Sequence, residues 1–332
     1  MRYLIQFPAG FSVLVERALA SDFAAVDARY ADDSSIVFDS RDRVRSVDDT
    51  PYAKNVFLVH AETPRRALAG SMTTLATSVP DLRGRRGRTP GFRLMYHVDG
   101  QLVSPEPKAR RDLEVAVARA SGLRLTPRGQ CTEYWVIGRR DLPMLYLGER
   151  LPRQRPAVKL RGSLSSELAS LLVSASRPRP DDVFLDPFSG TGSLLEARSQ
   201  RPFRSMLYND SDLSRYREGL GEWSRRRDKV RLLAEDARKL PSVPTGSVDV
   251  MVTDPPWGEF DDHIGDYDEF AGAVAACFRR ILHPDKGRLV VLVNRRNEEI
   301  MANALLSSDL KVNEYFRILV NGHPATALSA EI

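Results

Sequence analysis

The pattern of apolar and polar positions changes character about halfway along the chain. From about Lys159 onward, short fully apolar runs alternate with amphipathic stretches of helical period. Apolar strands joined by helical crossovers are typical of a parallel sheet covered on both faces. The last two strand-like segments meet at Asn321-Gly322, a pair that favours a hairpin turn. The predicted strands of this half are 182–186, 205–208, 230–234, 248–253, 288–293, 311–320 and 325–332, and the predicted helices include 165–176, 212–227 and 267–282.

The first 150 residues carry a different mixture of short strand and helix signals. The stretch 106–122 places Leu113, Ala116, Val117 and Ala120 on one face of a predicted helix. Pro64 is expected to open another helix, because proline is tolerated in a first helical turn. The first 80 residues suit a small α+β unit with an antiparallel sheet. The predicted strands are 3–7, 25–30, 35–39, 56–60, 92–98, 132–137 and 144–147, with a further helix at 11–20.

These two patterns predict two domains, for which 332 residues are sufficient. Residues 1–150 are expected to form an α+β region and residues 159–332 an α/β domain with a mainly parallel sheet. A stretch rich in proline and arginine, 151–158, is expected to link them. The predicted fold class is therefore α/β, with a Rossmann-like domain preceded by a smaller α+β region.

Composition places the chain among folded proteins, with 42% hydrophobic and 28% charged residues. No apolar run approaches the roughly 20 residues of a membrane span, and the N-terminus lacks the pattern of a secretory signal. The two cysteines, Cys131 and Cys277, form no disulfide framework, and the five histidines are scattered. We therefore expect a cytoplasmic protein with no membrane association and no metal site.

Charge is unevenly distributed along the chain. The stretch 83–161 holds 18 lysines and arginines against 7 acidic residues, whereas the rest of the chain is net acidic. Such an asymmetry suggests a polyanionic partner, although a solvated basic surface explains it equally well. A Gly/Arg loop at the start of this stretch makes Arg85, Arg86 and Arg88 candidates for contacts with nucleic-acid phosphates.

One motif follows the predicted strand 182–186, which runs into Asp186-Pro-Phe188-Ser-Gly190-Thr191-Gly192. Glycines between a buried strand and a helix let a ligand approach the backbone and the helix N-terminal amides. The spacing differs from the dinucleotide pattern of three glycines. A plain turn is the alternative interpretation, and the setting of strand, turn and helix favours ligand binding.

A second motif, Thr253-Asp254-Pro255-Pro256-Trp257-Gly, ends the strand 248–253. The two prolines make a rigid turn that fixes the flanking carboxylate and aromatic ring. Because ligands of parallel α/β sheets bind beside the carboxyl ends of the strands, this turn is expected to lie in the same crevice as the glycine loop. Either motif alone has a structural explanation, but the two together predict a catalytic site.

The two motifs resemble those of S-adenosylmethionine-dependent amino-methyltransferases, which carry Asp/Asn-Pro-Pro-aromatic and act on adenine N6, cytosine N4 or guanine N2. The Asp186 and Asp254 motifs look most like those of the THUMP-type tRNA guanosine N2-methyltransferases. That resemblance covers the half from about Lys159 onward and implies a class I methyltransferase domain. For the first 150 residues it rests on element order and implies a ferredoxin-like or THUMP-like RNA-binding region. This chain departs by having Trp257 where tyrosine or phenylalanine is commoner, and by its short N-terminal half.

The resemblance also implies roles for individual residues. Asp254, Pro255 and Trp257 would hold the target base, with Trp257 stacking on it. S-adenosylmethionine would be bound by the glycine loop, comprising Asp186, Phe188, Gly190, Thr191 and Gly192, and by Asp210, Asp236 and Ala237. Asp210 would accept from the ribose hydroxyls and Asp236 from the adenine amine, because an ionised carboxylate only accepts hydrogen bonds. Asp212 competes with Asp210 for the ribose role.

The expected function is methylation of an exocyclic base amine, guanosine N2 of tRNA at position 10 or 6, and the expected partner is tRNA or another structured RNA. A DNA adenine-N6 or cytosine-N4 methyltransferase would use the same aspartate and prolines, but no sequence-reading domain of that kind is visible. A non-catalytic RNA-binding protein with a decayed methyltransferase fold is the alternative from another class, and the intact motifs argue against it. The modified nucleotide, the number of methyl groups and the oligomeric state stay open.

Overall fold

The computed structural model describes residues 1–83, 91–126, 129–153, 162–213, 229–258 and 265–332. The chain forms two compact units, Met1–Phe7 with Val15–Pro156 and Pro8–Leu14 with Ala157–Ile332. The sequence pattern did not predict that residues 8–14 group with the second half. The predicted limits 1–150, 151–158 and 159–332 stay predictions. In the described ranges, no helix is both long and apolar enough to cross a bilayer.

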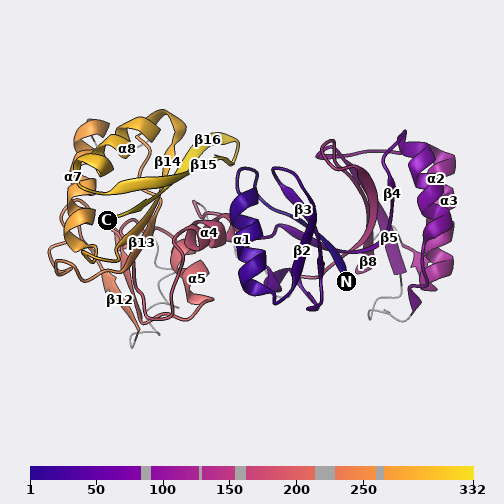
Figure 1. Cartoon of the computed structure of the whole chain (residues 1–332), viewed down its shortest axis with the longest axis horizontal. Coiled ribbons are helices and arrows are strands. Elements are labelled where there is room, and N and C mark those ends of the chain that lie inside the picture. Colours follow the sequence, from indigo (N-terminus) through magenta and orange to yellow (C-terminus); the bar gives the residue numbers. More distant parts are fainter. Residues whose placement is uncertain (84–90, 127–128, 154–161, 214–228, 259–264) are drawn as a thin grey trace. The chain divides into compact units, whose positions relative to one another are not determined.

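A nine-stranded sheet with the order β2-β3-β1-β4-β9-β8-β5-β6 builds the first unit, and β7 also pairs with β5 (Figure 1). Helices α2 and α3 lie side by side on one face of it, over a core that includes Leu75, Phe92, Leu113 and Val136. The elements of this region are β1 (Arg2–Gln6), α1 (Ser12–Asp22), β2 (Val26–Ala31), β3 (Ser35–Ser40), β4 (Asn55–Pro64), α2 (Leu68–Ser78), β5 (Gly91–Val98), β6 (Gln101–Leu102), α3 (Pro107–Ser121), β7 (Arg124–Leu125), β8 (Thr132–Gly138) and β9 (Met144–Arg150).

In the sequence, the strands before and after residue 83 looked like two separate clusters, but in the structure they pair within one sheet. The first four strands pair antiparallel, as expected. Strand β9 pairs antiparallel with both β4 and β8, so that one sheet runs through the whole region. Strand β5 pairs parallel with β8, because the crossover between them contains α3 and returns the chain in the same direction.

Two local predictions for this unit were wrong in detail. Pro64 ends β4 opposite Met144 instead of opening a helix, and α2 begins at Leu68. A strand end tolerates proline, because the missing N–H leaves no gap in the middle of the ladder. In α3 the fully buried stripe includes Leu113 and Val117, whereas Ala116 and Ala120 are half-buried.

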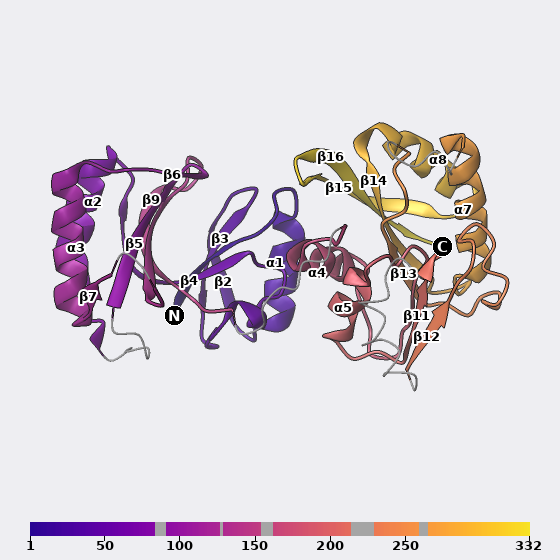
Figure 2. The ribbon, with the colours of Figure 1, turned by 180° about the vertical axis from the view of Figure 1, so that it is seen from behind.

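The second unit has the predicted arrangement, a seven-stranded sheet with the order β12-β11-β10-β13-β14-β16-β15. The first five strands in this order are parallel, and β16 is antiparallel to both neighbours. Helices α7 and α8 cover one face and α4 and α5 the other (Figure 2). The elements are α4 (Ser166–Ala175), β10 (Val183–Asp186), α5 (Ser193–Ser199), β11 (Ser205–Asn209), β12 (Val230–Leu233), β13 (Val250–Thr253), α7 (Tyr267–Ile281), β14 (Arg288–Asn294), α8 (Glu298–Ser307), β15 (Lys311–Val320) and β16 (His323–Glu331).

The central strands explain why the sequence read as continuous apolar runs. Every residue of β13 and β14 is buried, because helices cover the sheet on both sides. Asn321 and Gly322 turn the β15–β16 hairpin with φ of 51° and 89°, the left-handed conformation that the pair favours. The predicted helix 212–227 lies almost wholly outside the described residues. Helix α8 had not been predicted.

A buried ion cluster lies at the amino end of the central strands. Asp182, directly before β10, accepts a hydrogen bond from Arg288 at the start of β14. It also lies 3.5 Å from the guanidinium of Arg198 in α5. The three residues are 2%, 5% and 0% exposed. One carboxylate therefore neutralises two arginines that solvent does not reach, at the end of the sheet opposite the predicted site.

Candidate active site

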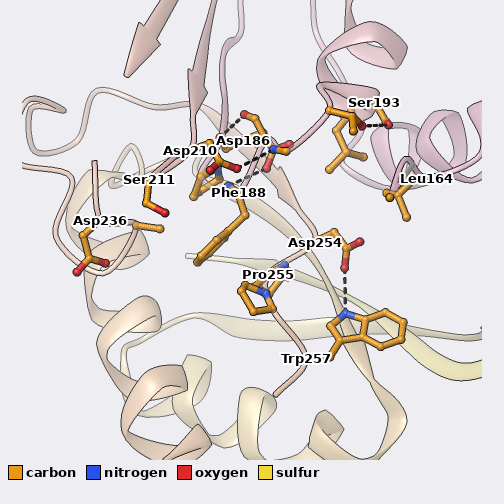
Figure 3. Close-up of a pocket in the computed structure, with 18 of the residues that line it drawn as sticks. Leu164, Asp186, Phe188, Ser193, Asp210, Ser211, Asp236, Asp254, Pro255 and Trp257 are labelled. Atoms are coloured by element: carbon orange, nitrogen blue, oxygen red, sulfur yellow. Dashed lines mark hydrogen bonds between the residues drawn. The ribbon is translucent and has the colours of Figure 1, made fainter. Parts of the chain in front are cut away.

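The carboxyl ends of β10, β11, β12 and β13 open into one pocket of about 680 Å³ (Figure 3). Ligands of open parallel α/β sheets bind at this edge, where the strand order reverses on either side of the first strand. The structure brings ten of the eleven predicted catalytic and cofactor residues to the pocket wall. They are Asp186, Phe188, Gly190, Thr191, Asp210, Asp236, Ala237, Asp254, Pro255 and Trp257.

Asp186 is the buried anchor of the site. Its Oδ1 accepts hydrogen bonds from the Thr253 hydroxyl at 2.8 Å and the Phe188 amide at 3.1 Å. The side chain is 1% exposed, and burial raises its pKa to about 8 despite these two donors. The Asp186 carboxyl therefore links the glycine loop after β10 to Thr253, the last residue of β13, which directly precedes Asp254.

The backbone of the glycine loop is held from the neighbouring strand. Gly190 adopts φ of 50°, donates its amide to Asp210 Oδ2 at 3.0 Å, and accepts the Tyr208 hydroxyl at its carbonyl. Gly192, with φ of 83°, is the N-cap residue of α5 and does not line the pocket. The first glycine therefore shapes the pocket wall, whereas the second serves the turn into the helix.

Of the two candidates for the ribose role, Asp210 lies at the pocket and Asp212 does not. Asp210 lines the pocket, and its Oδ1 accepts the Asp212 amide at 3.0 Å. Asp212 is not among the residues that line the pocket. Within the described residues, each Asp210 oxygen has one protein donor, which leaves it a second lone pair. This placement favours Asp210 in the competition for the ribose role, which stays a prediction.

Asp236 lies at the opposite side of the pocket from Asp254, with the Phe188 ring between them (Figure 3). The Arg238 guanidinium donates to both oxygens of Asp236, at 2.9 and 2.8 Å. This side-chain hydrogen bond holds the pKa of Asp236 below its usual value. The carboxylate is therefore ionised at neutral pH and already has one partner.

Asp254 comes directly after β13 and is half-buried. The Trp257 indole donates its Nε1–H to Asp254 Oδ1 at 2.9 Å across the Pro-Pro turn (Figure 3). Burial raises the pKa of Asp254 to about 7, and the indole hydrogen bond opposes that rise. The sequence placed both residues in the site but gave no indication that they bond to each other.

Other lining residues were missed by the sequence interpretation. Four of them lie next to predicted site residues at the carboxyl ends of the strands, where they could have been predicted: Ser193, Ser211, Glu235 and Arg238. Leu164, Phe270 and His323 come from distant segments that carry no local signal. Of the described residues that line the pocket, five carry carboxyl groups and one is an arginine, so acidic side chains outnumber basic ones in its wall.

Two further predictions, on RNA-binding arginines and on metal binding, concern features other than this pocket. Arg85, Arg86 and Arg88 lie outside the described residues. Within the described ranges no group of three or more histidine, cysteine, aspartate or glutamate residues has the arrangement of a metal site.

Comparisons with known proteins connect this geometry to a family. The sequence matches the RMKL-like methyltransferase domain over residues 152–202 and 222–324. A curated relative, the tRNA (guanine(6)-N2)-methyltransferase of Thermus thermophilus, is 32% identical over 208 residues. That alignment spans 60% of this chain and 60% of the relative's length.

Solved structures of the same fold cover both units. TrmN from Thermus thermophilus aligns with a TM-score of 0.77 at 21% identity, over 100% of this chain and 99% of its own. SMU.472 in complex with SAH gives 0.66 at 12% identity, over 99% and 97%. A predicted N6-adenine-specific DNA methylase from Listeria monocytogenes gives 0.66 at 13% identity, over 99% and 95%. These likenesses confirm the predicted fold class. The second half of this chain is similar to the RMKL-like methyltransferase domain over the two matched segments.

Proposed function

We propose that this protein uses S-adenosylmethionine to methylate an exocyclic base amine, guanosine N2 of tRNA. One observation carries the proposal: Asp254 and Pro255 share a pocket with the glycine loop and its carboxylates. The curated relative supports tRNA as the substrate and, of the two positions predicted, favours position 6 over position 10. The Listeria protein has the same fold, so the fold alone does not separate tRNA from DNA substrates.

The pocket fits S-adenosylmethionine in size and in charge. Its volume lies within the range of about 300–1,000 Å³ typical of small-molecule sites. The acidic wall suits a ligand that carries a sulfonium and an ammonium group. Phe188 and Phe270, whose ring centroids lie 6.0 Å apart, offer an apolar surface beside the carboxylates. In this proposal Asp210 accepts from the ribose hydroxyls, while Asp236 and Ala237 hold the adenine.

Mechanism follows from the weak nucleophilicity of the substrate amine, whose lone pair is delocalised into the base. Asp254 would accept one N–H of the amine and the Pro255 carbonyl the other, which directs the lone pair out of the base plane. S-adenosylmethionine, when bound, supplies an electrophilic methyl on a sulfonium that leaves as a neutral thioether. The amine nitrogen gains the N–C bond and sheds one proton, and Asp254, with a pKa of about 7, can accept it.

The proposed function is tested on nucleic acid from cells that lack the gene. Digested tRNA is compared with wild type by mass spectrometry, and the missing base is mapped to position 6 or 10. Loss of N2-methylguanosine, restored by the wild-type gene and not by Asp254→Ala, is the expected result. Unchanged tRNA together with altered DNA methylation would overturn the proposal.

Replacing Gly190 with valine is expected to weaken S-adenosylmethionine binding by about tenfold or more, roughly 1.4 kcal/mol. Gly190 lines the pocket with a left-handed φ of 50°, so a side chain there both strains the loop and enters the ligand's space. Isothermal titration measures the loss. Gly100→Val is the control, because Gly100 has φ of 84° and an added Cβ there meets no atom within 4 Å. A folded Gly190 variant with normal affinity would reduce the loop to a plain turn.

Substitution of Arg85, Arg86 and Arg88 together by alanine tests the proposed RNA contacts, which rest on the sequence alone. Each lost phosphate contact should flatten the slope of log affinity for tRNA against log salt by about 0.7–0.9. The change should be the same for different tRNAs, because phosphate contacts carry no sequence information. Three exposed arginines outside the basic stretch, Arg41, Arg43 and Arg45, make a matched control. Equal slopes for the two triple variants would remove this loop from the interface.

A further inference from the structure

The hydrogen bond between Trp257 and Asp254 uses only the edge of the indole. The N–H lies in the ring plane, and it reaches Asp254 Oδ1 at 2.9 Å. The bond itself therefore occupies neither ring face, while one oxygen of the carboxylate already has a donor. Phenylalanine has no such donor, so an aromatic ring without the indole N–H could stack but could not make this bond.

A second hydrogen bond holds the backbone that carries the indole. Asn297 donates its side-chain amide to the Trp257 carbonyl at 2.9 Å. Asn297 is the N-cap residue of α8, yet its side chain makes no capping hydrogen bond. Its side-chain N–H₂ therefore holds the Pro-Pro turn, while its Oδ1 accepts no capping hydrogen bond from the first turn of α8, although asparagine is a common N-cap acceptor.

Burial disfavours the charge of Asp254, and the hydrogen bond from Trp257 favours it. Asp186 lies behind Asp254 on β10, where its carboxyl is influenced by the charge of Asp254. Tyr267 approaches from α7, and burial raises its pKa to about 12, so that its hydroxyl stays protonated at neutral pH. His323 lines the same pocket from β16. Among the residues that the structure describes, the Trp257 indole is the one that donates a hydrogen bond to the Asp254 carboxylate.

We propose that Trp257 and Asn297 are positioning residues for Asp254. The indole N–H fixes one carboxylate oxygen and leaves the other for the substrate amine, and Asn297 holds the turn at the distance this requires. A carboxylate with one oxygen held loses less rotational freedom when the amine binds. The donor also favours the ionised form that accepts the amine. This inference rests on the proposed function for its kinetic part, but the hydrogen bond can be tested without substrate.

The first experiment follows the indole N–H signals of the full chain by NMR across a pH series. The chain has three tryptophans, and Trp257→Phe assigns the signal concerned. We expect that signal to titrate with a midpoint near pH 7, following Asp254, and Asp254→Asn to remove the titration. Trp135 is an internal comparison, because its indole donates to Glu133 at 3.1 Å. Burial works against the ionisation of Glu133, but its hydrogen bonds, first of all that from Arg93, hold its pKa below the usual value, so this signal should move only in acid.

The second experiment measures methyl transfer to tRNA. Trp257→Phe keeps a ring for stacking and loses the donor, so kcat at pH 7 should fall by about ten- to a hundredfold while KM for tRNA stays within about threefold. The acidic limb of kcat/KM should move to higher pH by about one unit, because the lost donor had favoured the ionised carboxylate. Trp135→Phe, which removes an indole–carboxylate bond in the first unit, should change neither quantity.

Asn297 is tested by a pair of substitutions. Asn297→Ala should lower kcat and shift the acidic limb in the same direction as Trp257→Phe, and Asn297→Gln should restore part of both. Asn303→Ala, at an exposed position of the same helix, should leave both unchanged. A merely structural role for Asn297 would lower the amount of folded enzyme without moving the pH limb.

The outcomes separate this inference from the proposed function. If wild-type protein methylates no tRNA but the Trp257 signal titrates with Asp254, the function fails and the positioning bond stands. If tRNA is methylated but the signal does not respond to Asp254, the positioning role is overturned. A Trp257→Phe variant with raised KM, unchanged kcat and an unshifted pH profile would assign Trp257 to stacking alone.

Discussion

Replacing Asp254 with alanine is expected to lower the rate of methyl transfer by about 10²–10³-fold, equivalent to about 2.7–4 kcal/mol in the barrier. In the proposed mechanism the carboxylate contacts the amine of the base and not the cofactor, so S-adenosylmethionine affinity should change by less than about threefold. Single-turnover transfer of a labelled methyl group to tRNA measures the rate, and isothermal titration measures the affinity. The alanine also releases the Trp257 indole, so part of the loss reflects the freed ring.

Asp254→Asn is the graded control for this substitution. It keeps an oxygen acceptor for the indole and the amine but removes the charge and the proton acceptor. Its rate should lie between those of the wild type and the alanine variant. An alanine variant with activity within threefold of wild type would exclude Asp254 from the mechanism.

The largest effect on stability is expected from Asp182→Ala. The substitution leaves the guanidinium groups of Arg198 and Arg288 buried without their carboxylate. Breaking a buried pair in this way typically costs about 3–5 kcal/mol, a large part of the stability of a domain. Arg198 still donates to the Arg179 carbonyl at 2.7 Å, and Arg288 still donates to the Ser176 carbonyl at 2.8 Å. These neutral oxygens do not compensate the two positive charges.

Urea unfolding followed by circular dichroism measures this loss. Asp181→Ala is the matched control, because Asp181 is the exposed neighbour of Asp182 and its loss should change stability by less than about 0.5 kcal/mol. Equal midpoints for the two variants would show that the arginines find other partners or reach solvent. Cofactor binding by the Asp182 variant, where it remains folded, should be unchanged, since the cluster lies at the far end of the strands.

The sequence predicted those parts of the site that are determined by strand order. Asp186, Asp210, Asp236 and Asp254 each follow an apolar run, and parallel pairing brings such positions to one edge. The contacts made within that edge were not predictable in the same way. The bond from Trp257 to Asp254 depends on the dihedral angles of the Pro-Pro turn, and that from Asn297 depends on where α8 begins.

Local signals also failed where tertiary pairing decided the outcome. Proline is common in the first turn of a helix, but Pro64 pairs with Met144 of β9 at the end of strand β4. Helix α2 therefore begins only at Leu68. The two clusters of the first half looked separate, because the sequence does not show that β9 pairs with both β4 and β8. Gly192, predicted together with Gly190 to bind the cofactor, is the N-cap residue of α5 and does not line the pocket, and the cofactor role of both glycines stays a prediction.

In the proposed function, the raised pKa values in the pocket would couple cofactor binding to proton release. Burial raises the pKa of Asp186 to about 8 and that of Asp254 to about 7, whereas both would titrate near 4 in an unfolded chain. Between about pH 4 and pH 8 the folded chain therefore keeps protons that the unfolded chain has released, so folding stability falls as the pH rises through this window. In the proposed function, the positive charge of S-adenosylmethionine favours the ionised form of Asp186, so a proton leaves as the cofactor binds. Apparent cofactor affinity should therefore rise with pH up to about pH 8, where Asp186 ionises.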